Sequence, residues 1–166
     1  AGAHGFISKP LFKSNLYLGL KPFVKEEDTK QEVKKIEERD FTGKSILLAE
    51  DNDLNWEIAE EILSAAGFKL ERAENGKVCV EKFMASPVGT YDVVLMDIRM
   101  PVMSGYDAAL AIRKLERADA GLPIIAMTAD AFSEDIQHCL DCGMNAHISK
   151  PIDIQKLIHE LNKYLK

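Results

Sequence analysis

The chain has 166 residues, enough for one ordinary domain with additional segments. Hydrophobic residues make up 46% of it and charged residues 29%, a composition that excludes a wholly disordered or fibrous protein. The net charge is −6, and an acidic chain without a basic stripe argues against a nucleic-acid partner.

The first segment, residues 1–24, contains an internal repeat of a segment near the C-terminus. Residues 2–10 (GAHGFISKP) match residues 143–151 (GMNAHISKP) at five positions with a constant offset, and the helical pattern that follows is in phase. We interpret residues 1–24 as the last strand and helix of a preceding domain with the same fold. The chain begins within this pattern, so we expect it to be a fragment of a longer protein.

Residues 25–44 form a strongly charged connector. The pairs Glu26–Lys30 and Lys34–Glu38 have the i,i+4 spacing that supports an exposed helix, so we expect a helical linker, with a disordered tether as the alternative. The charge also changes here. Residues 1–44 carry nine basic and seven acidic side chains, whereas residues 45–166 carry twelve and twenty. The excess acidity therefore belongs to the third part, residues 45–166.

From residue 45 onward, short apolar runs alternate with amphipathic helical segments. The predicted strands cover residues 46–49, 68–72, 93–96, 123–127 and 146–148. The first helix is predicted over 53–66 with Asp53 as its N-cap, and the last follows Asp153 with a regular apolar stripe. Five buried strands that alternate with helices indicate an α/β fold, a doubly wound five-stranded parallel sheet with helices on both faces. We expect the flavodoxin-like strand order 2-1-3-4-5.

Polar residues follow four of the predicted strands, where ligands bind in such folds. They are Glu50 and Asp51 after the first strand, Asp97 after the third, Thr128 after the fourth and Lys150 after the fifth. Three neighbouring carboxylates repel one another and need a cation, and hard oxygen ligands suit Mg²⁺. A lysine and a hydroxyl opposite them suit a phosphoryl group, which a carboxylate can accept as an aspartyl phosphate.

These residues lie in segments that resemble the receiver domain of two-component signalling, of the type found in hybrid sensor histidine kinases. The resembling segments are 46–55 (ILLAEDNDLN), 94–106 (VLMDIRMPVMSGY), 124–129 (IIAMTA) and 143–151 (GMNAHISKP). The resemblance covers nearly all of residues 45–166. It implies a phosphorelay switch whose partner is a histidine kinase or a histidine phosphotransfer domain, and it implies that the fragment catalyses its own phosphorylation and dephosphorylation.

The resemblance also implies a role for each polar residue. Asp97 would be the phosphoacceptor, while Thr128 contacts the phosphoryl group and Lys150 pairs with it. The implied Mg²⁺ ligands are Glu50, Asp51, Asp97 and the backbone carbonyl of Arg99. In this family the peptide bond between the lysine and the following proline is usually cis, so we expect a cis bond between Lys150 and Pro151.

Some positions depart from the commonest family pattern or add to it. The switch position, usually Phe or Tyr, is His147 here, which leaves open a coupled aromatic motion, a pH-sensitive switch or plain packing. We expect Arg99 and Asp130 to pair across the mouth of the site. Trp56, the only tryptophan, is predicted at the edge of the apolar stripe of the first helix, where it packs against a loop or contacts a docking partner.

Two other functional classes stay open at this stage. A pseudo-receiver that only binds partners is one alternative, and a phosphohydrolase with an aspartyl nucleophile is the less favoured one, because Arg99 stands where such enzymes carry a second acid. The longest uncharged run, residues 120–129, is too short to span a membrane. Three cysteines without a signal peptide indicate a reducing compartment. We therefore expect a cytoplasmic domain with no direct membrane contact, and a membrane anchor elsewhere in the parent and homodimerisation stay open.

The expected Arg99–Asp130 pair leads to a first prediction. Arg99→Ala should shorten the half-life of the phosphorylated domain, because the pair would hinder water attack on the phosphoryl group. Loss of label from phosphorylated wild type and variant measures this half-life. An unchanged half-life would remove Arg99 from that role.

Overall fold

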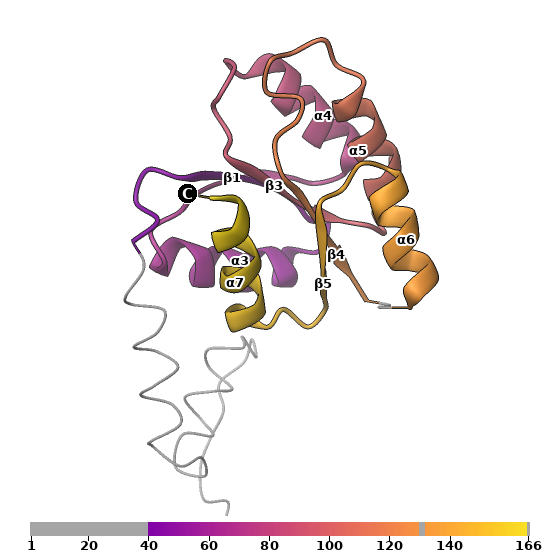
Figure 1. The fold of residues 1–166 in the computed structure, drawn as a ribbon. Coiled ribbons are helices and arrows are strands. Elements are labelled where there is room, and N and C mark those ends of the chain that lie inside the picture. The colour runs from indigo at the N-terminus through magenta and orange to yellow at the C-terminus, as the bar shows by residue number, and fades with distance from the viewer. Residues whose placement is uncertain (1–39, 130–131, 166) are drawn as a thin grey trace, which may run out of the picture. The chain divides into compact units, whose positions relative to one another are not determined.

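The computed structural model describes residues 40–129 and 132–165, which form five strands that alternate with five helices (Figure 1). The strands are β1 (Ser45–Ala49), β2 (Lys69–Ala73), β3 (Val93–Asp97), β4 (Ile124–Thr128) and β5 (Ala146–Ser149). The helices are α3 (Asp53–Ala65), α4 (Gly76–Ala85), α5 (Gly105–Arg113), α6 (Ser133–Asp141) and α7 (Ile154–Tyr164). The interpretations of residues 1–24 and of residues 25–44 as a linker stay predictions for residues 1–39, which lie outside the described residues. Of the predicted linker, residues 40–44 are described, and its Phe41 is buried against the domain.

All strand pairs are parallel and the strand order is β2-β1-β3-β4-β5, so the predicted flavodoxin-like fold is confirmed. Strands β1, β3 and β4 are buried almost throughout, as expected for strands covered on both faces. The register pairs Asp97 with Met127 and Thr128 with Ser149. The carboxyl ends of β3, β4 and β5 therefore finish side by side at one edge of the sheet.

Two separate apolar cores lie on the two faces of the sheet. Helices α4, α5 and α6 cover one face, and helices α3 and α7 cover the other (Figure 1). Alternate strand residues supply the two cores: Leu47 and Ala49 face the first, whereas Ile46 and Leu48 face the second. Phe41, which precedes β1, stacks on Phe68 with 4.4 Å between ring centroids and belongs to the second core.

The helix starts agree with the sequence patterns, with one correction. The N-cap of α3 is Asn52, whose side chain accepts a hydrogen bond from the amide of Asn55, so the prediction of Asp53 as N-cap was wrong by one residue. Both residue types cap helices well, so the pattern alone does not choose between neighbours. The predicted cap of α7 is confirmed, because Asp153 accepts from the amides of Gln155 and Lys156.

The described residues include no helix that is both long and apolar enough to cross a bilayer.

The second strand is shifted by one residue from its prediction, beginning at Lys69 rather than Phe68. Phe68 instead leaves the ladder and fills the second core, since its side chain is almost fully buried. Arg72 lies within both the predicted and the observed strand, and the register places it beside Leu48 of β1.

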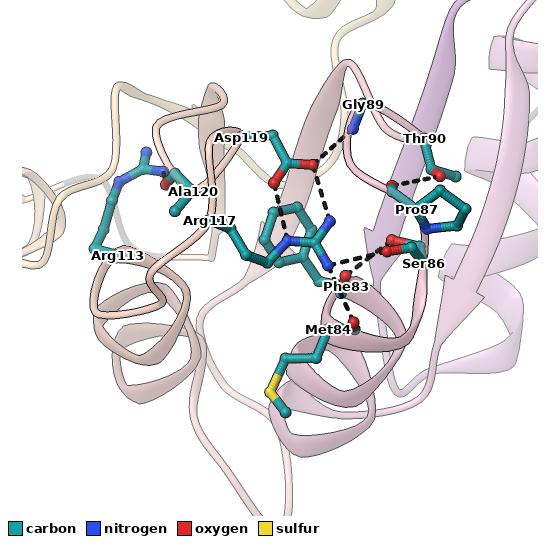
Figure 2. Close-up of polar contacts among 10 residues, drawn as sticks. All are labelled: Phe83, Met84, Ser86, Pro87, Gly89, Thr90, Arg113, Arg117, Asp119 and Ala120. Atoms are coloured by element: carbon teal, nitrogen blue, oxygen red, sulfur yellow. Dashed lines mark hydrogen bonds and ion pairs between the residues drawn. The ribbon is translucent and has the colours of Figure 1, made fainter.

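An arginine clasp closes the end of the sheet opposite the carboxyl ends of the strands. Arg117, in the loop before β4, donates from Nη1 to the carbonyl oxygens of Met84 and Ser86 at 3.0 and 2.9 Å (Figure 2). Its Nε and Nη2 donate to the two carboxylate oxygens of Asp119 at 2.9 and 3.0 Å. The clasp satisfies carbonyl groups that the end of α4 leaves without helical partners.

The clasp predicts an acid-dependent loss of stability. Hydrogen bonds from Arg117 lower the pKa of Asp119 to about 2, below its ordinary value of about 3.8. Asp119 therefore stabilises the fold at neutral pH, and this contribution is lost as the pH falls through about 2. We expect Asp119→Asn to lower the thermal unfolding midpoint by a few degrees at pH 7, with a difference from wild type that shrinks below about pH 4.

Circular dichroism melts between pH 7 and pH 2 measure this difference. Asp141→Asn, which changes an exposed carboxylate on α6 outside the clasp, is the matched control and should show no such pH-dependent difference. If the wild type and Asp119→Asn differed as much at pH 2 as at pH 7, Asp119 would not act through its charge.

Candidate functional site

The structure brings the predicted polar residues together at the carboxyl edge of the sheet. Asp97 is the last residue of β3 and Thr128 the last of β4, while Glu50 and Lys150 directly follow β1 and β5. Asp51 comes next along the chain after Glu50 and is exposed. Because the strands are parallel and neighbours in the sheet, their ends converge.

Glu50 is a buried carboxylate at the base of this site, and hydrogen bonds hold both of its oxygens. Its side chain is 2% exposed, and its Oε2 accepts a hydrogen bond from Nζ of Lys150 at 2.7 Å. Its Oε1 accepts from the amide of Asn52 at 3.1 Å and from Nδ2 of Asn55 at 3.3 Å. With both oxygens held by donors on other elements, Glu50 ties β1 to the start of α3 and to the end of β5.

Asp97 is the second buried carboxylate, and its Oδ2 lies 3.0 Å from Nζ of Lys150. Burial raises the pKa of Asp97 above its ordinary value, although the charge of Lys150 opposes that rise. Burial by itself would lower the pKa of Lys150, but its hydrogen bond to Glu50 and the charge of Asp97 outweigh burial and raise it. Lys150 is thus held in its charged form between the two carboxylates.

Three carboxylates make up the acidic cluster of Glu50, Asp51 and Asp97, with one oxygen of each within 4.8 Å of the others. Lys150 offsets part of this negative charge, and Asp51 keeps the cluster open to solvent. Oxygen ligands that leave room for water are the donors that Mg²⁺ prefers. The residues therefore fit a hydrated divalent cation in their chemistry.

The remaining predicted residues border the cluster. Thr128 is 7% exposed, and its carbonyl oxygen accepts from the amide of Lys150 at 2.7 Å, so the ends of β4 and β5 are fixed to each other. The expected cis bond between Lys150 and Pro151 is present. Beside the cluster runs an open pocket lined by Asp51, Ile98, Arg99, Met100, Pro101, Ser104, Tyr106, Thr128 and Asp135. The pocket provides space for a substrate group next to Asp97.

The residues that depart from the commonest family pattern, or add to it, lie in different parts of the structure. His147 is half-buried on β5 opposite Ala126, and its function stays a prediction. Arg99 is exposed at the mouth, but Asp130 lies outside the described residues, so their pairing also stays a prediction. Trp56 is partly buried against the core formed by α3 and α7.

Sequence reasoning missed Arg72, the residue that holds the loop of Glu50 and Asp51. Its Nε donates to the carbonyl oxygen of Glu50 and its Nη2 to that of Asp51, both at 3.2 Å. The available signal was that β2 neighbours β1 in the predicted order and carries a cation near its carboxyl end. Asn55 was missed as well, and its contact with Glu50 depends on where α3 begins.

The chain matches known proteins over the same residues that form this site. Residues 46–162 match the family model described as the response regulator receiver domain. The hybrid signal transduction histidine kinase M of Dictyostelium discoideum is 42% identical over 120 residues, which cover 71% of this chain and 5% of that protein. The peroxide stress-activated histidine kinase mak1 of Schizosaccharomyces pombe is 38% identical over 118 residues, which cover 70% of this chain and 7% of that protein. The chain therefore spans only a small part of the length of these relatives.

Solved structures give a similar picture. The receiver domain of a sensor histidine kinase from Pseudomonas aeruginosa, with a magnesium ion coordinated in its active site cleft, is 36% identical with a TM-score of 0.67. That match covers 74% of this chain and 98% of that one. The receiver domain of the response regulator Ssk1, crystallised with the Saccharomyces cerevisiae histidine phosphotransfer protein Ypd1, is 26% identical with a TM-score of 0.66. That match covers 75% of this chain and 90% of the Ssk1 receiver chain.

The backbone of Asp97 is held by a close approach from α5. The amide of Gly105 donates to the carbonyl oxygen of Ile98 at 2.9 Å, and a Cβ placed at Gly105 would overlap the carbonyl oxygen of Asp97. We expect Gly105→Ala to push the start of α5 away from β3 and to destabilise the fold by about 1–3 kcal/mol, as overpacking does. Urea unfolding measures the loss.

Gly121→Ala is the matched control for this glycine. A Cβ at Gly121 meets no atom within 4 Å, so the same added methyl group should leave the free energy of unfolding nearly unchanged. Equal effects of the two substitutions would mean that the approach to Asp97 does not require a glycine.

Proposed function

The chain belongs to the response regulator receiver family, and we propose that Asp97 is the residue that accepts the phosphoryl group in a two-component phosphorelay. The observation that carries the proposal is the position of Asp97, whose Oδ2 lies 3.0 Å from Nζ of Lys150 and whose carboxylate lies within 4.8 Å of oxygens of Glu50 and Asp51. A buried carboxylate beside a lysine and an acidic cluster suits phosphoryl transfer to an aspartate.

In the proposed reaction, an oxygen of Asp97 attacks the phosphorus atom of a phosphohistidine. The new P–O bond forms as the P–N bond breaks, and the departing imidazole keeps the bonding electrons and takes up a proton. Lys150 then pairs with a phosphoryl oxygen, because its ammonium group already lies against Asp97. The hydroxyl group of Thr128 offers a hydrogen bond to the same group from the end of β4.

We assign the Mg²⁺ ligands to the acidic cluster of Glu50, Asp51 and Asp97 and to the backbone carbonyl of Arg99. Mg²⁺, when bound, supplies positive charge that stabilises the phosphoryl oxygens during transfer. The magnesium ion in the cleft of the solved Pseudomonas receiver domain supports this assignment. Asp51 is the exposed member of the cluster and is therefore the natural point of entry for the cation.

The partner in this proposal is a protein that carries a phosphohistidine, either a histidine kinase or a histidine phosphotransfer domain. The complex of the Ssk1 receiver domain with Ypd1 supports such a partner. The histidine kinases among the relatives support a parent protein that is itself a hybrid histidine kinase. Kinases of this type depend on ATP, so the proposed place of action is the cytoplasm.

Two rival functions make different predictions for the same reagents. A pseudo-receiver would take up no phosphoryl group, and a phosphohydrolase would turn over external phosphate esters without keeping a stable label. The acidic cluster and Lys150 favour the phosphoacceptor, since a domain that only binds partners has no need to bury two carboxylates around a partly buried lysine.

The test is phosphorylation of the whole chain by a small phosphodonor with Mg²⁺, followed by intact-protein mass spectrometry. We expect stable incorporation in the wild type and none in Asp97→Asn, because an amide is not a nucleophile under these conditions. Asp141→Asn, far from the cluster on α6, is the control and should incorporate label as the wild type does. Incorporation into Asp97→Asn would overturn the assignment of Asp97, and ester turnover without incorporation would favour the hydrolase.

A further inference from the structure

Arg72 reaches from the edge strand β2 to the acidic loop, which we define as residues 50–52 between β1 and α3. Its two donated hydrogen bonds, to the carbonyl oxygens of Glu50 and Asp51, fix two successive peptide groups, one on each side of the Cα atom of Asp51. The amide of Glu50 donates to the carbonyl oxygen of Ala73, the next residue of β2, at 3.0 Å. The acidic loop is thus hydrogen-bonded to the end of β2 through two of its carbonyl oxygens, which accept, and through one of its amides, which donates.

The guanidinium group of Arg72 has two further contacts. It lies 5.7 Å from the centroid of the Trp56 ring, within the range of a cation–π interaction, and its Nη2 lies 2.7 Å from Oδ1 of Asp53. The Arg72 side chain is 22% exposed, whereas that of Asp53 is 87% exposed. The guanidinium group of Arg72 is therefore held by two carbonyl oxygens, the Trp56 ring and the Asp53 carboxylate, and it has little rotational freedom.

The carboxylate of Asp51 depends on this support more than its neighbours do. Glu50 and Asp97 are held by side-chain hydrogen bonds and by burial. Asp51 is exposed, and within the described residues no hydrogen bond or ion pair to its carboxylate is seen. The direction of its Cα–Cβ bond is set by the backbone, and that backbone is what Arg72 holds.

We propose that Arg72 is a positioning residue for Mg²⁺: by fixing the acidic loop, it aims Asp51 at Asp97 and so raises the affinity of the cluster for the cation. The proposal rests on the proposed function in one respect, since it takes the acidic cluster to be a Mg²⁺ site. Groups that orient metal ligands typically contribute ten-fold or more to metal affinity, because a loose ligand must be ordered when the metal binds.

Charge alone would give Arg72 the opposite effect, since a cation beside a cation site weakens binding. Asp53 removes much of this repulsion because it pairs with the guanidinium at 2.7 Å. Arg72→Met by itself would leave Asp53 unpaired and add a net negative charge, which attracts Mg²⁺ and masks the loss of positioning. The double variant Arg72→Met/Asp53→Asn keeps the net charge of the wild type and isolates the positioning effect.

Arg117 provides a matched control at the other end of the sheet. It too donates to two carbonyl oxygens, pairs with a carboxylate and lies over an aromatic ring, at 4.7 Å from the centroid of Phe83 (Figure 2). Arg117→Met/Asp119→Asn therefore removes the same set of interactions from the opposite end of the sheet. It should lower stability without changing Mg²⁺ affinity.

The experiment is a Mg²⁺ titration of the whole chain, followed by the fluorescence of Trp56 and, independently, by calorimetry. Midpoints rather than amplitudes are compared, because Arg72 lies over the ring that gives the signal. We expect the dissociation constant for Mg²⁺ to rise about ten-fold in Arg72→Met/Asp53→Asn and to stay at the wild-type value in Arg117→Met/Asp119→Asn. Arg72→Lys keeps the charge but not the fork, and should show an intermediate loss.

Each other outcome has a definite meaning. Wild-type affinity in Arg72→Met/Asp53→Asn would overturn the proposal, as would an equal loss in the Arg117 control, which would show only general destabilisation. If the double variant fails to fold, Arg72→Lys decides the matter: unchanged affinity overturns the proposal and weakened affinity supports it. Absence of Mg²⁺ binding in the wild type would instead remove the cation site from the proposed function.

Discussion

The ion network around Lys150 is the interaction on which the rest of the site depends. The side chain of Lys150 is 18% exposed, and from a position just beyond β5 its ammonium group binds a carboxylate that follows β1 and another at the end of β3. It therefore joins the ends of three strands that are far apart in the chain. Burying isolated charges costs several kcal/mol each, and the network is stable because each charge has an opposite partner and further hydrogen bonds. A phosphoryl group and a cation would enter a site whose charges are already fixed in place.

The two ends of the sheet are closed by different means, which is consistent with different roles. At the end opposite the site, Arg113 and Arg117 bind backbone carbonyls of neighbouring loops, and the charge of Arg117 is offset by its ion pair with Asp119. At the carboxyl edge, carboxylates outnumber the lysine that offsets them, and Asp51 faces solvent. Arg72 combines the two patterns, because it donates to backbone carbonyls of the loop that carries the exposed Asp51. Arginine bonds to backbone carbonyls thus hold loops at both ends of the sheet, and the excess of carboxylates is confined to the carboxyl edge.

Much of the fold could be predicted because its periodic signals are strong. The buried runs that became β1, β3 and β4 have no competing interpretation, and the regular stripe after Asp153 became α7. The errors are local. Asn52 rather than Asp53 caps α3, since two adjacent good capping residues give the same pattern, and β2 begins one residue late because Phe68 is drawn into the core. The cluster of Glu50, Asp51 and Asp97 followed from the strand order, since parallel strand ends converge.

The sequence by itself determined the parallel fold, the order of its strands and the set of acidic and basic residues at their ends. The strands and their end residues follow from local periodicity and from which residue comes after each strand. The strand order follows from the doubly wound topology that such a series of strands and helices adopts. Only the tertiary structure decided which groups touch. The lysine bonds to Glu50 as well as to Asp97, and Arg72 reaches across from β2 to hold two carbonyl oxygens of another loop. Such contacts depend on side-chain reach between neighbouring strands. The predicted strand order places Arg72 near the loop after β1, but it does not say which atoms meet.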